Sequence, residues 1–141
     1  MAAILRTASG VWRGDLRGGS GEISGTSGVL SNTPFSFATR FENAKGTNPE
    51  ELIAAAHAAC FSMAFANYLS EQGHKPEEIS THATISLENG DINKMQLETK
   101  GKVPGLSQAD FKRLADEAEK KCPVSNLLRD HLTITLEASL S

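Results

Sequence analysis

Hydrophobic and polar side chains alternate along residues 35–42, which is the clearest strand pattern in the chain. A period of two places three phenylalanines on one face and Arg40 on the opposite face. Glycines divide residues 3–42 into short segments, among them 10–13, so we expect this whole stretch to be rich in β-strands. The pattern therefore predicts that Arg40 points away from the phenylalanines.

Two further alternating segments lie in the second half of the chain. Residues 81–87 form the first, and the Asn89-Gly90 pair after them predicts a hairpin that leads into a strand through Met95 and Leu97. Residues 132–137 form the last strand. Strands, helices and strands in this order predict an α+β fold with antiparallel sheets.

A long apolar helix is predicted between the two strand-rich regions. Asn48 suits the N-cap, Pro49 suits the first helical position, and Glu51 stands three residues after the cap. The helix should end near Glu71. Its middle, residues 54–66, is apolar on nearly every side, so we expect the helix to be buried at the centre of the fold.

A second helix is predicted to begin after Ser107, which can cap it. The Cys122-Pro123 step should break this helix, because a proline disfavours helical backbone in the residue before it. Residues 123–129 then allow about two further helical turns with Pro123 at the first position. Cys122 is therefore a candidate N-cap.

Length, charge and cysteine usage narrow the class of protein. The 141 residues suit one hydrophobic core, so we predict a single domain over residues 1–141. The net charge is −3 and the basic residues form no stripe, so we expect no nucleic-acid partner. Polar residues interrupt the apolar stretches, so we expect neither secretion nor a membrane span. Two cysteines in dissimilar contexts are typical of a reducing compartment, and we expect a cytoplasmic protein.

Cys60 lies in the middle of the apolar helix. Burial alone would raise the pKa of its thiol above the free value of about 8.5 and leave it unreactive. A reactive Cys60 therefore needs a positive partner. The candidates are His57, Arg13, Arg17 and Arg40. Arg40 is favoured slightly, because its strand is the best defined and its side chain is expected off the phenylalanine face.

Cys122 has a different environment, at an expected helix start directly after Lys120 and Lys121. Both features would lower the pKa of its thiol. A thiol of low pKa is a good leaving group, which suits a disulfide that forms in each cycle and is reopened by an external dithiol. The alternative is that Cys122 only fills a gap at the helix break.

The same region allows two other interpretations. His57, Cys60 and Cys122 could together bind a metal ion, although no fourth ligand stands at a familiar spacing. Glu50 and Glu51 could simply complement the dipole of the long helix, and for Glu51 we prefer that explanation.

Residues 46–63 and the Cys-Pro-Val-Ser sequence at 122–125 strongly resemble the OsmC/Ohr family of organic hydroperoxide reductases. The resemblance also includes residues 10–15, 27–30 and 39–42. The Ala-Ala-His-Ala-Ala-Cys sequence that ends at Cys60, and the position of Arg40, are similar to the OsmC branch (osmotically inducible protein C).

The resemblance implies a role for four residues. Cys60 would be the peroxidatic cysteine and Cys122 the resolving cysteine. Arg40 would stabilise the Cys60 thiolate, and Glu50 would orient Arg40. An arginine of the loop at 13–17 could replace Arg40 if that loop folds over the site.

The resemblance also implies an intertwined homodimer without metal or cofactor, active in oxidative and osmotic stress defence. The substrate would be an organic hydroperoxide, and a dithiol such as the dihydrolipoyl group of a partner protein would recycle the enzyme. The Cys60 thiolate would attack the peroxide, and the resulting sulfenic acid would condense with Cys122. The alternative is a non-catalytic dimer of the same fold that binds a small apolar ligand.

The spacing of Glu50 and Cys60 bears on the dimer. The two residues are ten positions apart, which is about 15 Å along one helix. We therefore expect Glu50 of one subunit to serve Cys60 of the other, with the two long helices crossing near residues 54–56.

Overall fold

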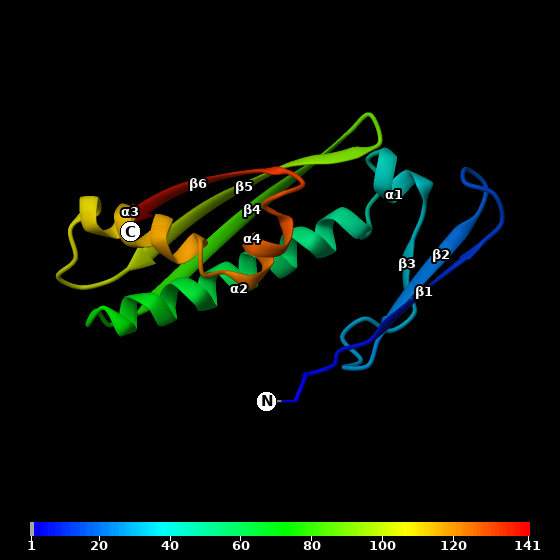
Figure 1. Ribbon diagram of the computed structural model, residues 1–141. Helices are drawn as coiled ribbons and strands as arrows, with labels where there is room; N and C mark the ends of the chain where they lie inside the picture. The colour runs from blue at the N-terminus through cyan, green and yellow to red at the C-terminus, as the bar shows by residue number, and fades with distance from the viewer. Residues whose placement is uncertain (1) are drawn as a thin grey trace. The chain divides into compact units, whose positions relative to one another are not determined.

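The structure is a computed structural model that describes residues 2–141 (Figure 1). The chain divides into two compact units, one that runs to Leu52 and one that covers Ile53–Ser141. The division falls within the first turns of the long helix α2 (Pro49–Glu71). Each unit has its own three-stranded sheet. The expected single domain over residues 1–141 stays a prediction.

The first unit contains an antiparallel sheet of β1 (Ala8–Arg13), β2 (Ser20–Gly25) and β3 (Thr33–Phe35). Gly21 stands opposite Trp12 in one strand pair and opposite Phe35 in the next. A Cβ atom at Gly21 would lie 2.5 Å from the Phe35 ring and 2.7 Å from the Trp12 ring. The absence of a side chain at Gly21 therefore leaves space for the rings of Trp12 and Phe35, whose centroids lie 5.4 Å apart.

The predicted strand over residues 35–42 is wrong beyond Phe35, because the chain turns into the short helix α1 (Phe37–Phe41). Ser36 and Thr39 form a capping box: the Thr39 N–H donates to Ser36 Oγ at 3.2 Å, and the Ser36 N–H donates to Thr39 Oγ1 at 2.9 Å. These local bonds satisfy helix-end groups and override the alternating pattern. Arg40 consequently lies on a helix, with its guanidinium over the Phe41 ring, 5.2 Å from the centroid.

Helix α2 begins as predicted and spans 23 residues. The Glu51 N–H donates to Asn48 Oδ1 at 2.8 Å, which confirms Asn48 as the cap. The Glu51 carboxylate accepts a hydrogen bond from Thr47 Oγ1 at 2.7 Å and does not complete a capping box with the Asn48 backbone. By length and composition alone α2 could cross a membrane, a test that the core helix of a soluble protein also passes.

Only one face of α2 is buried in the single chain, although the helix is apolar nearly all round. The buried residues are Glu50, His57, Phe61, Phe65 and Leu69. The opposite face exposes Ala55, Ala56, Ala59 and Met63, the last of these with 76% of its surface accessible. In the single chain, the expectation of a helix buried on every side therefore holds for only one face of α2.

The second unit has a mixed sheet in the order β4, β5, β6. β4 (Glu78–Glu88) and β5 (Asp91–Lys102) pair antiparallel through the predicted turn, where Asn89 and Gly90 both have positive φ. β6 (Thr133–Leu140) runs parallel to β5, so the expectation of purely antiparallel sheets is wrong for this pair. The helical connection between β5 and β6 explains the parallel pairing. Two parallel strands need a long crossover, because the chain must return to the end of the sheet at which the first strand began.

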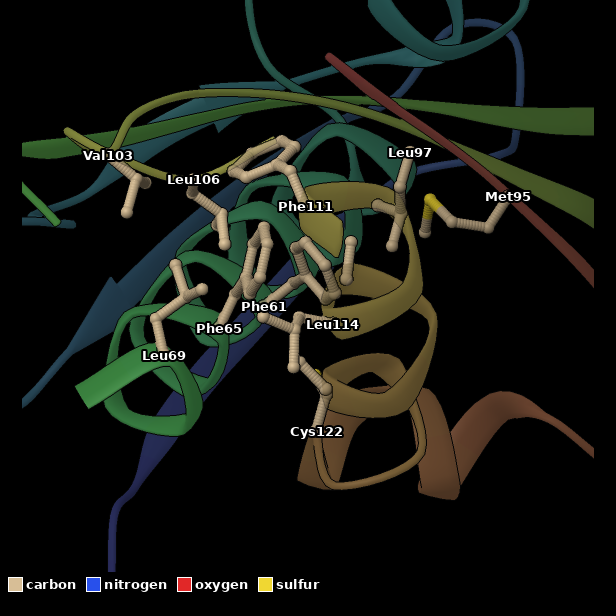
Figure 2. Packing of buried hydrophobic residues seen from close by; sticks show 12 residues of the cluster. Phe61, Phe65, Leu69, Met95, Leu97, Val103, Leu106, Phe111, Leu114 and Cys122 are labelled. Carbon is tan, nitrogen blue, oxygen red and sulfur yellow. The ribbon is translucent and has the colours of Figure 1, made fainter. Parts of the chain in front are cut away.

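The hydrophobic core of the second unit lies between α2, the sheet and helix α3 (Gln108–Glu119) (Figure 2). The Phe65 ring packs between Phe61 and Phe111, with centroid distances of 5.6 Å and 5.0 Å. Met95 and Leu97 of β5 are fully buried against them. Each such side chain contributes about 1.5–3 kcal/mol to folding by leaving water. This core holds α2 on one face of the sheet.

The junction between α3 and α4 (Pro123–Leu128) contains Cys122 as the N-cap of α4, as predicted. Arg129 ties the two helices together. Its guanidinium donates to Glu119 Oε1 at 2.8 Å, to the Glu119 carbonyl at 3.2 Å and to Asn126 Oδ1 at 2.9 Å. The Asn126 side-chain amide donates to the Lys120 carbonyl at 3.1 Å. These bonds fix the short segment that carries Cys122.

Candidate active site

The two cysteines meet at the edge of the core in the second unit. Cys60 comes from the middle of α2 and Cys122 from the α3–α4 junction, and both are free thiols. Their sulfur atoms lie 3.4 Å apart. A disulfide needs an S–S distance of about 2.05 Å, so a small movement would join them. The sequence-predicted pair is therefore brought together.

Cys60 is the more accessible of the two thiols, because Cys122 is fully buried. Cys60 opens onto a cleft of about 360 Å³ that Met63, Tyr68 and Lys121 also line. Burial raises the pKa of the Cys60 thiol, and the neighbouring Cys122 raises it further, while a hydrogen bond to the Val124 backbone acts in the opposite direction. Within this unit Cys60 is therefore not activated.

Cys122 has the opposite electrostatic character. Burial acts to raise its pKa, but interactions with His57, with the backbone and side chain of Ser125, and with Cys60 outweigh burial and lower the pKa to about 6. The direction agrees with the prediction from its place at a helix start. Of the two lysines expected to contribute, Lys121 has its ammonium over the Tyr68 ring, 5.3 Å from the centroid, and it lines the cleft of Cys60.

His57 and Ser125 form a buried contact that the sequence did not reveal. His57 Nε2 lies 2.6 Å from Ser125 Oγ, and both side chains are fully buried. His57 was expected as a candidate cation for Cys60, whereas it approaches Ser125 and Cys122 instead. His57 and Ser125 are 68 positions apart in the chain, so no local sequence pattern links them. The sequence signal for Ser125 was its place three residues after Cys122.

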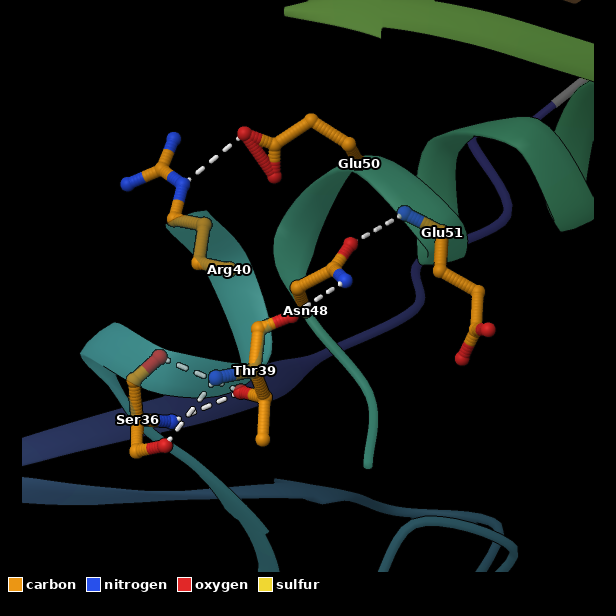
Figure 3. A network of polar contacts seen from close by, with 6 residues as sticks. All are labelled: Ser36, Thr39, Arg40, Asn48, Glu50 and Glu51. Carbon is orange, nitrogen blue, oxygen red and sulfur yellow. Dashed lines mark hydrogen bonds and ion pairs between the residues drawn. The ribbon is translucent and has the colours of Figure 1, made fainter. Parts of the chain in front are cut away.

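Arg40 and Glu50 form an ion pair in the first unit (Figure 3). Arg40 Nε donates to Glu50 Oε1 at 2.8 Å, and Glu50 is 6% exposed. The pair has one hydrogen bond rather than the two that a bidentate arrangement gives, and the buried Glu50 Oε2 has no partner among residues 2–141. The terminal nitrogens of Arg40 make no hydrogen bond within the same described residues. Glu50 therefore holds Arg40 while leaving its other donors available.

Arg40 also lines an apolar cleft of about 230 Å³ in the first unit. The other residues around this cleft are Trp12, Leu16, Phe35, Ser36, Phe37 and Phe41. Arg40 thus lies among the phenylalanines, and the expectation that it points away from them is wrong. The reason is the helical backbone of α1, which brings positions 37, 40 and 41 to one side.

The alternative arginines have other contacts. Arg13 pairs with Glu22 at 3.6 Å, and both side chains are exposed. The Arg17 guanidinium lies over the Phe37 ring, 4.5 Å from its centroid. The structure therefore gives Arg40 a carboxylate partner that is buried, while the partner of Arg13 is open to solvent.

Metal-ligating side chains do not gather in the part of the chain that the structure describes. No group of three or more His, Cys, Asp or Glu residues in this part is placed to hold a metal ion. The second unit instead has a pair of thiols, and the first unit has, separately, a pair of opposite charges. An α+β chain with two free thiols whose sulfur atoms lie 3.4 Å apart belongs to the class of two-cysteine thiol proteins.

Comparisons with known proteins agree with this class. A family model described as OsmC-like protein matches residues 42–137. The chain is 46% identical over 127 residues to peroxiredoxin OsmC of Escherichia coli (strain K12). The aligned region covers 87% of this chain and 89% of that protein. It is 36% identical over 95 residues to the organic hydroperoxide resistance protein of Xanthomonas axonopodis pv. citri, covering 64% of this chain and 66% of that protein.

A solved structure described as an organic hydroperoxide resistance protein OsmC, from Legionella pneumophila, has the same fold. Its TM-score is 0.69 at 26% sequence identity, and the match covers 99% of both chains. The chain therefore belongs to the OsmC-like protein family, which confirms the predicted family and the α+β fold. The relatives support a peroxidase-type role.

Proposed function

We propose that this protein is a thiol-dependent peroxidase that reduces organic hydroperoxides to alcohols with Cys60 and Cys122. The observation that carries the proposal is the distance of 3.4 Å between the two sulfur atoms. The Cys60 thiolate attacks the distal peroxide oxygen, the O–O bond breaks, and the alcohol leaves after taking up a proton. Cys60 becomes a sulfenic acid, which condenses with Cys122 to a disulfide and water.

Arg40 supplies the positive charge that Cys60 needs in this proposal. Burial raises the pKa of Cys60, so a cation is required to favour the thiolate. Arg40 has available guanidinium donors and is held by the buried Glu50 carboxylate. A guanidinium beside the sulfur would also stabilise charge that develops on the peroxide oxygens.

In this proposal a homodimer brings Arg40 of one subunit to Cys60 of the other. Glu50 and Cys60 are ten residues apart on α2, about 15 Å along the helix axis, so one copy of the helix cannot bring them together. The exposed face of α2 carries small side chains at Ala55, Ala56 and Ala59, which allow close approach of a second copy. The Arg40–Glu50 pair of one subunit would then serve Cys60 of the other.

The substrate class follows from the lining of the cleft that contains Arg40. Aromatic and aliphatic side chains make up most of that lining, and they favour an organic group over the small, polar hydrogen peroxide. Arg40 is the charged residue there and would orient the peroxide end. We therefore assign organic hydroperoxides as the substrates.

Recycling requires a dithiol reductant, for which the dihydrolipoyl group of a partner protein is our proposal. An external thiolate can reach Cys60 more readily than the fully buried Cys122. Attack at the Cys60 sulfur releases Cys122, whose low pKa makes it a good leaving group. We also propose a cytoplasmic location and a role in oxidative and osmotic stress defence.

The direct test is the mass and thiol count of the protein after one equivalent of an alkyl hydroperoxide. The wild-type chain should lose two hydrogen atoms and both free thiols. Cys122→Ser should stop at a trapped sulfenic acid on Cys60, and Cys60→Ser should leave the peroxide unconsumed. Peroxide consumption that survives Cys60→Ser would refute the proposal. Binding of a small apolar ligand without any thiol oxidation would favour the non-catalytic alternative.

A further inference from the structure

His57 is a buried titratable side chain that the proposed catalytic cycle leaves without a task. It lies one helical turn before Cys60 on α2 and is fully buried. Its Nε2 atom is 2.6 Å from Ser125 Oγ, and its Nδ1 atom has no hydrogen-bond partner among residues 2–141. A buried imidazole nitrogen without a partner is costly, and such a position often has a functional reason.

Ser125 connects His57 to the resolving cysteine. It is the third residue of α4, the helix whose N-cap is Cys122, and its backbone and side chain both act to lower the pKa of Cys122. His57 also acts to lower that pKa, and it lies one helical turn before Cys60, whose sulfur is 3.4 Å from the Cys122 sulfur. Because His57, Ser125 and Cys122 all have 0% exposure, bulk water does not screen the interactions among them.

The other titratable groups near the α3–α4 junction are occupied or exposed. They include Cys60, Glu119, Lys120, Lys121 and Arg129, together with Tyr68 and Glu117, which hydrogen-bond to each other. Glu119 is paired with Arg129, and both lysines are exposed to solvent. Cys60 is the partner with which Cys122 reacts. His57 is therefore the buried and otherwise unused titratable side chain of this cluster.

We propose that His57, supported by Ser125, is the acid–base partner of Cys122 in the step that closes the disulfide. The inference rests on the proposed peroxidase function. His57 accepts the thiol proton of Cys122, and the thiolate attacks the sulfur of the Cys60 sulfenic acid. The S–O bond breaks as the S–S bond forms, and the departing hydroxide takes the proton to leave as water. One sulfenic acid and one thiol thus give one disulfide and one water molecule.

The ionisation of Cys122 tests this proposal without any peroxide. The ultraviolet absorbance of the thiolate is titrated against pH in the Cys60→Ser chain, where Cys122 is the remaining cysteine. We expect a midpoint below the free value and somewhat above the value of about 6 in the intact site, because the contribution of Cys60 is removed. His57→Gln in this background should move the midpoint toward the free value of about 8.5. His131→Gln is the matched control, because His131 is exposed, and it should leave the midpoint unchanged.

Ser125→Ala provides a second variant in the same titration and should move the midpoint part of the way. A midpoint that stays near the parent value in His57→Gln would overturn the proposal. If His57→Gln does not fold, an unchanged midpoint in Ser125→Ala would overturn it. A merely structural role for His57 would lower the unfolding temperature and leave the midpoint in place.

The rate of disulfide closure tests the step itself. In chains with both cysteines, His57→Gln should slow conversion of the sulfenic acid to the disulfide about 30-fold at pH 7, because the thiolate fraction of Cys122 falls. Formation of the sulfenic acid at Cys60 should keep its wild-type rate. Closure at the wild-type rate would contradict the proposal. A chain that forms no sulfenic acid at all would instead refute the peroxidase function, while the titration would still report on His57.

Discussion

The two units of this protein carry different side chains of the proposed peroxidase. The first unit holds charge: Glu50 fixes Arg40 beside an apolar cleft. The second unit holds sulfur: Cys60 and Cys122 face each other with pKa values shifted in opposite directions. Cys60, the proposed peroxidatic thiol, is the one whose pKa is raised within its own unit. The proposed mechanism therefore needs a cation beside the Cys60 thiolate, and Arg40 is the cation that we propose.

The largest expected effect concerns the core of the second unit. Phe65→Ala removes a fully buried ring between Phe61 and Phe111 and should lower the free energy of unfolding by about 3–5 kcal/mol. Urea unfolding followed by circular dichroism measures the loss. Phe41→Ala in the first unit is the control, and it should cost less because 46% of Phe41 is exposed.

The same unfolding experiment tests whether the two units unfold independently. The chain has one tryptophan, Trp12, and it lies in the first unit, so its fluorescence reports that unit alone. We expect the fluorescence transition to move less than the circular dichroism transition in Phe65→Ala. Equal movement of both would show that the two units unfold as one.

A smaller effect is expected from removing the positive charge of the first unit. Arg40→Met should slow sulfenic acid formation at Cys60 about 100-fold, which corresponds to about 2.7 kcal/mol of lost stabilisation. Arg40→Lys keeps the charge but loses the planar fork, so its rate should lie between the two. Stopped-flow measurement of peroxide consumption gives these rates. An unchanged rate in Arg40→Met would show that the charge of Arg40 takes no part in the reaction at Cys60.

Stability should also depend on pH through Cys122. The folded pKa is about 6, whereas an unfolded thiol titrates near about 8.5, so the unfolded chain binds more protons between these values. The stabilisation is thus complete above about pH 8.5 and disappears as the pH falls through about 6. We expect a gain of about 3 kcal/mol over this range in Cys60→Ser relative to Cys60→Ser with Cys122→Ser. Parallel curves for the two chains would contradict the lowered pKa.

The smallest expected effect comes from the cap that orients Arg40. Ser36→Ala removes the side-chain acceptor for the Thr39 N–H and should cost about 1 kcal/mol of stability. The peroxide rate should fall by a few-fold, since α1 frays and Arg40 is held less firmly. Ser70→Ala, at an exposed position of α2, is the matched control. A loss of stability in Ser36→Ala without loss of rate would show that Glu50 alone positions Arg40.

Local signals explain which elements could be predicted from the sequence. Asn48, Pro49 and the Asn89-Gly90 turn act through neighbouring backbone groups, and the elements they predict are present. The helix α1 was missed because the Ser36–Thr39 capping box competes with a convincing alternation. The parallel pairing of β6 was missed because strand direction depends on residues far apart in the chain.

The candidate site divides in the same way. The pairing of Cys60 with Cys122 and of Arg40 with Glu50 could be expected once the family was recognised. The His57–Ser125 contact could not, because no local pattern links residues separated by 68 positions. The roles of the four expected residues, the homodimer and the reductant stay predictions.

The clamp of Arg129 across the α3–α4 junction has a consequence for the fate of the enzyme under heavy oxidant load. Because Arg129 holds the segment of Cys122 in place, the second sulfur already stands beside Cys60 when the first oxidation occurs. In the proposed cycle, a nascent sulfenic acid would then be captured before another peroxide could drive it to the irreversible sulfinic form. Such a preset trap would make this protein resistant to inactivation by its own substrate, without any unfolding of the chain between turnovers.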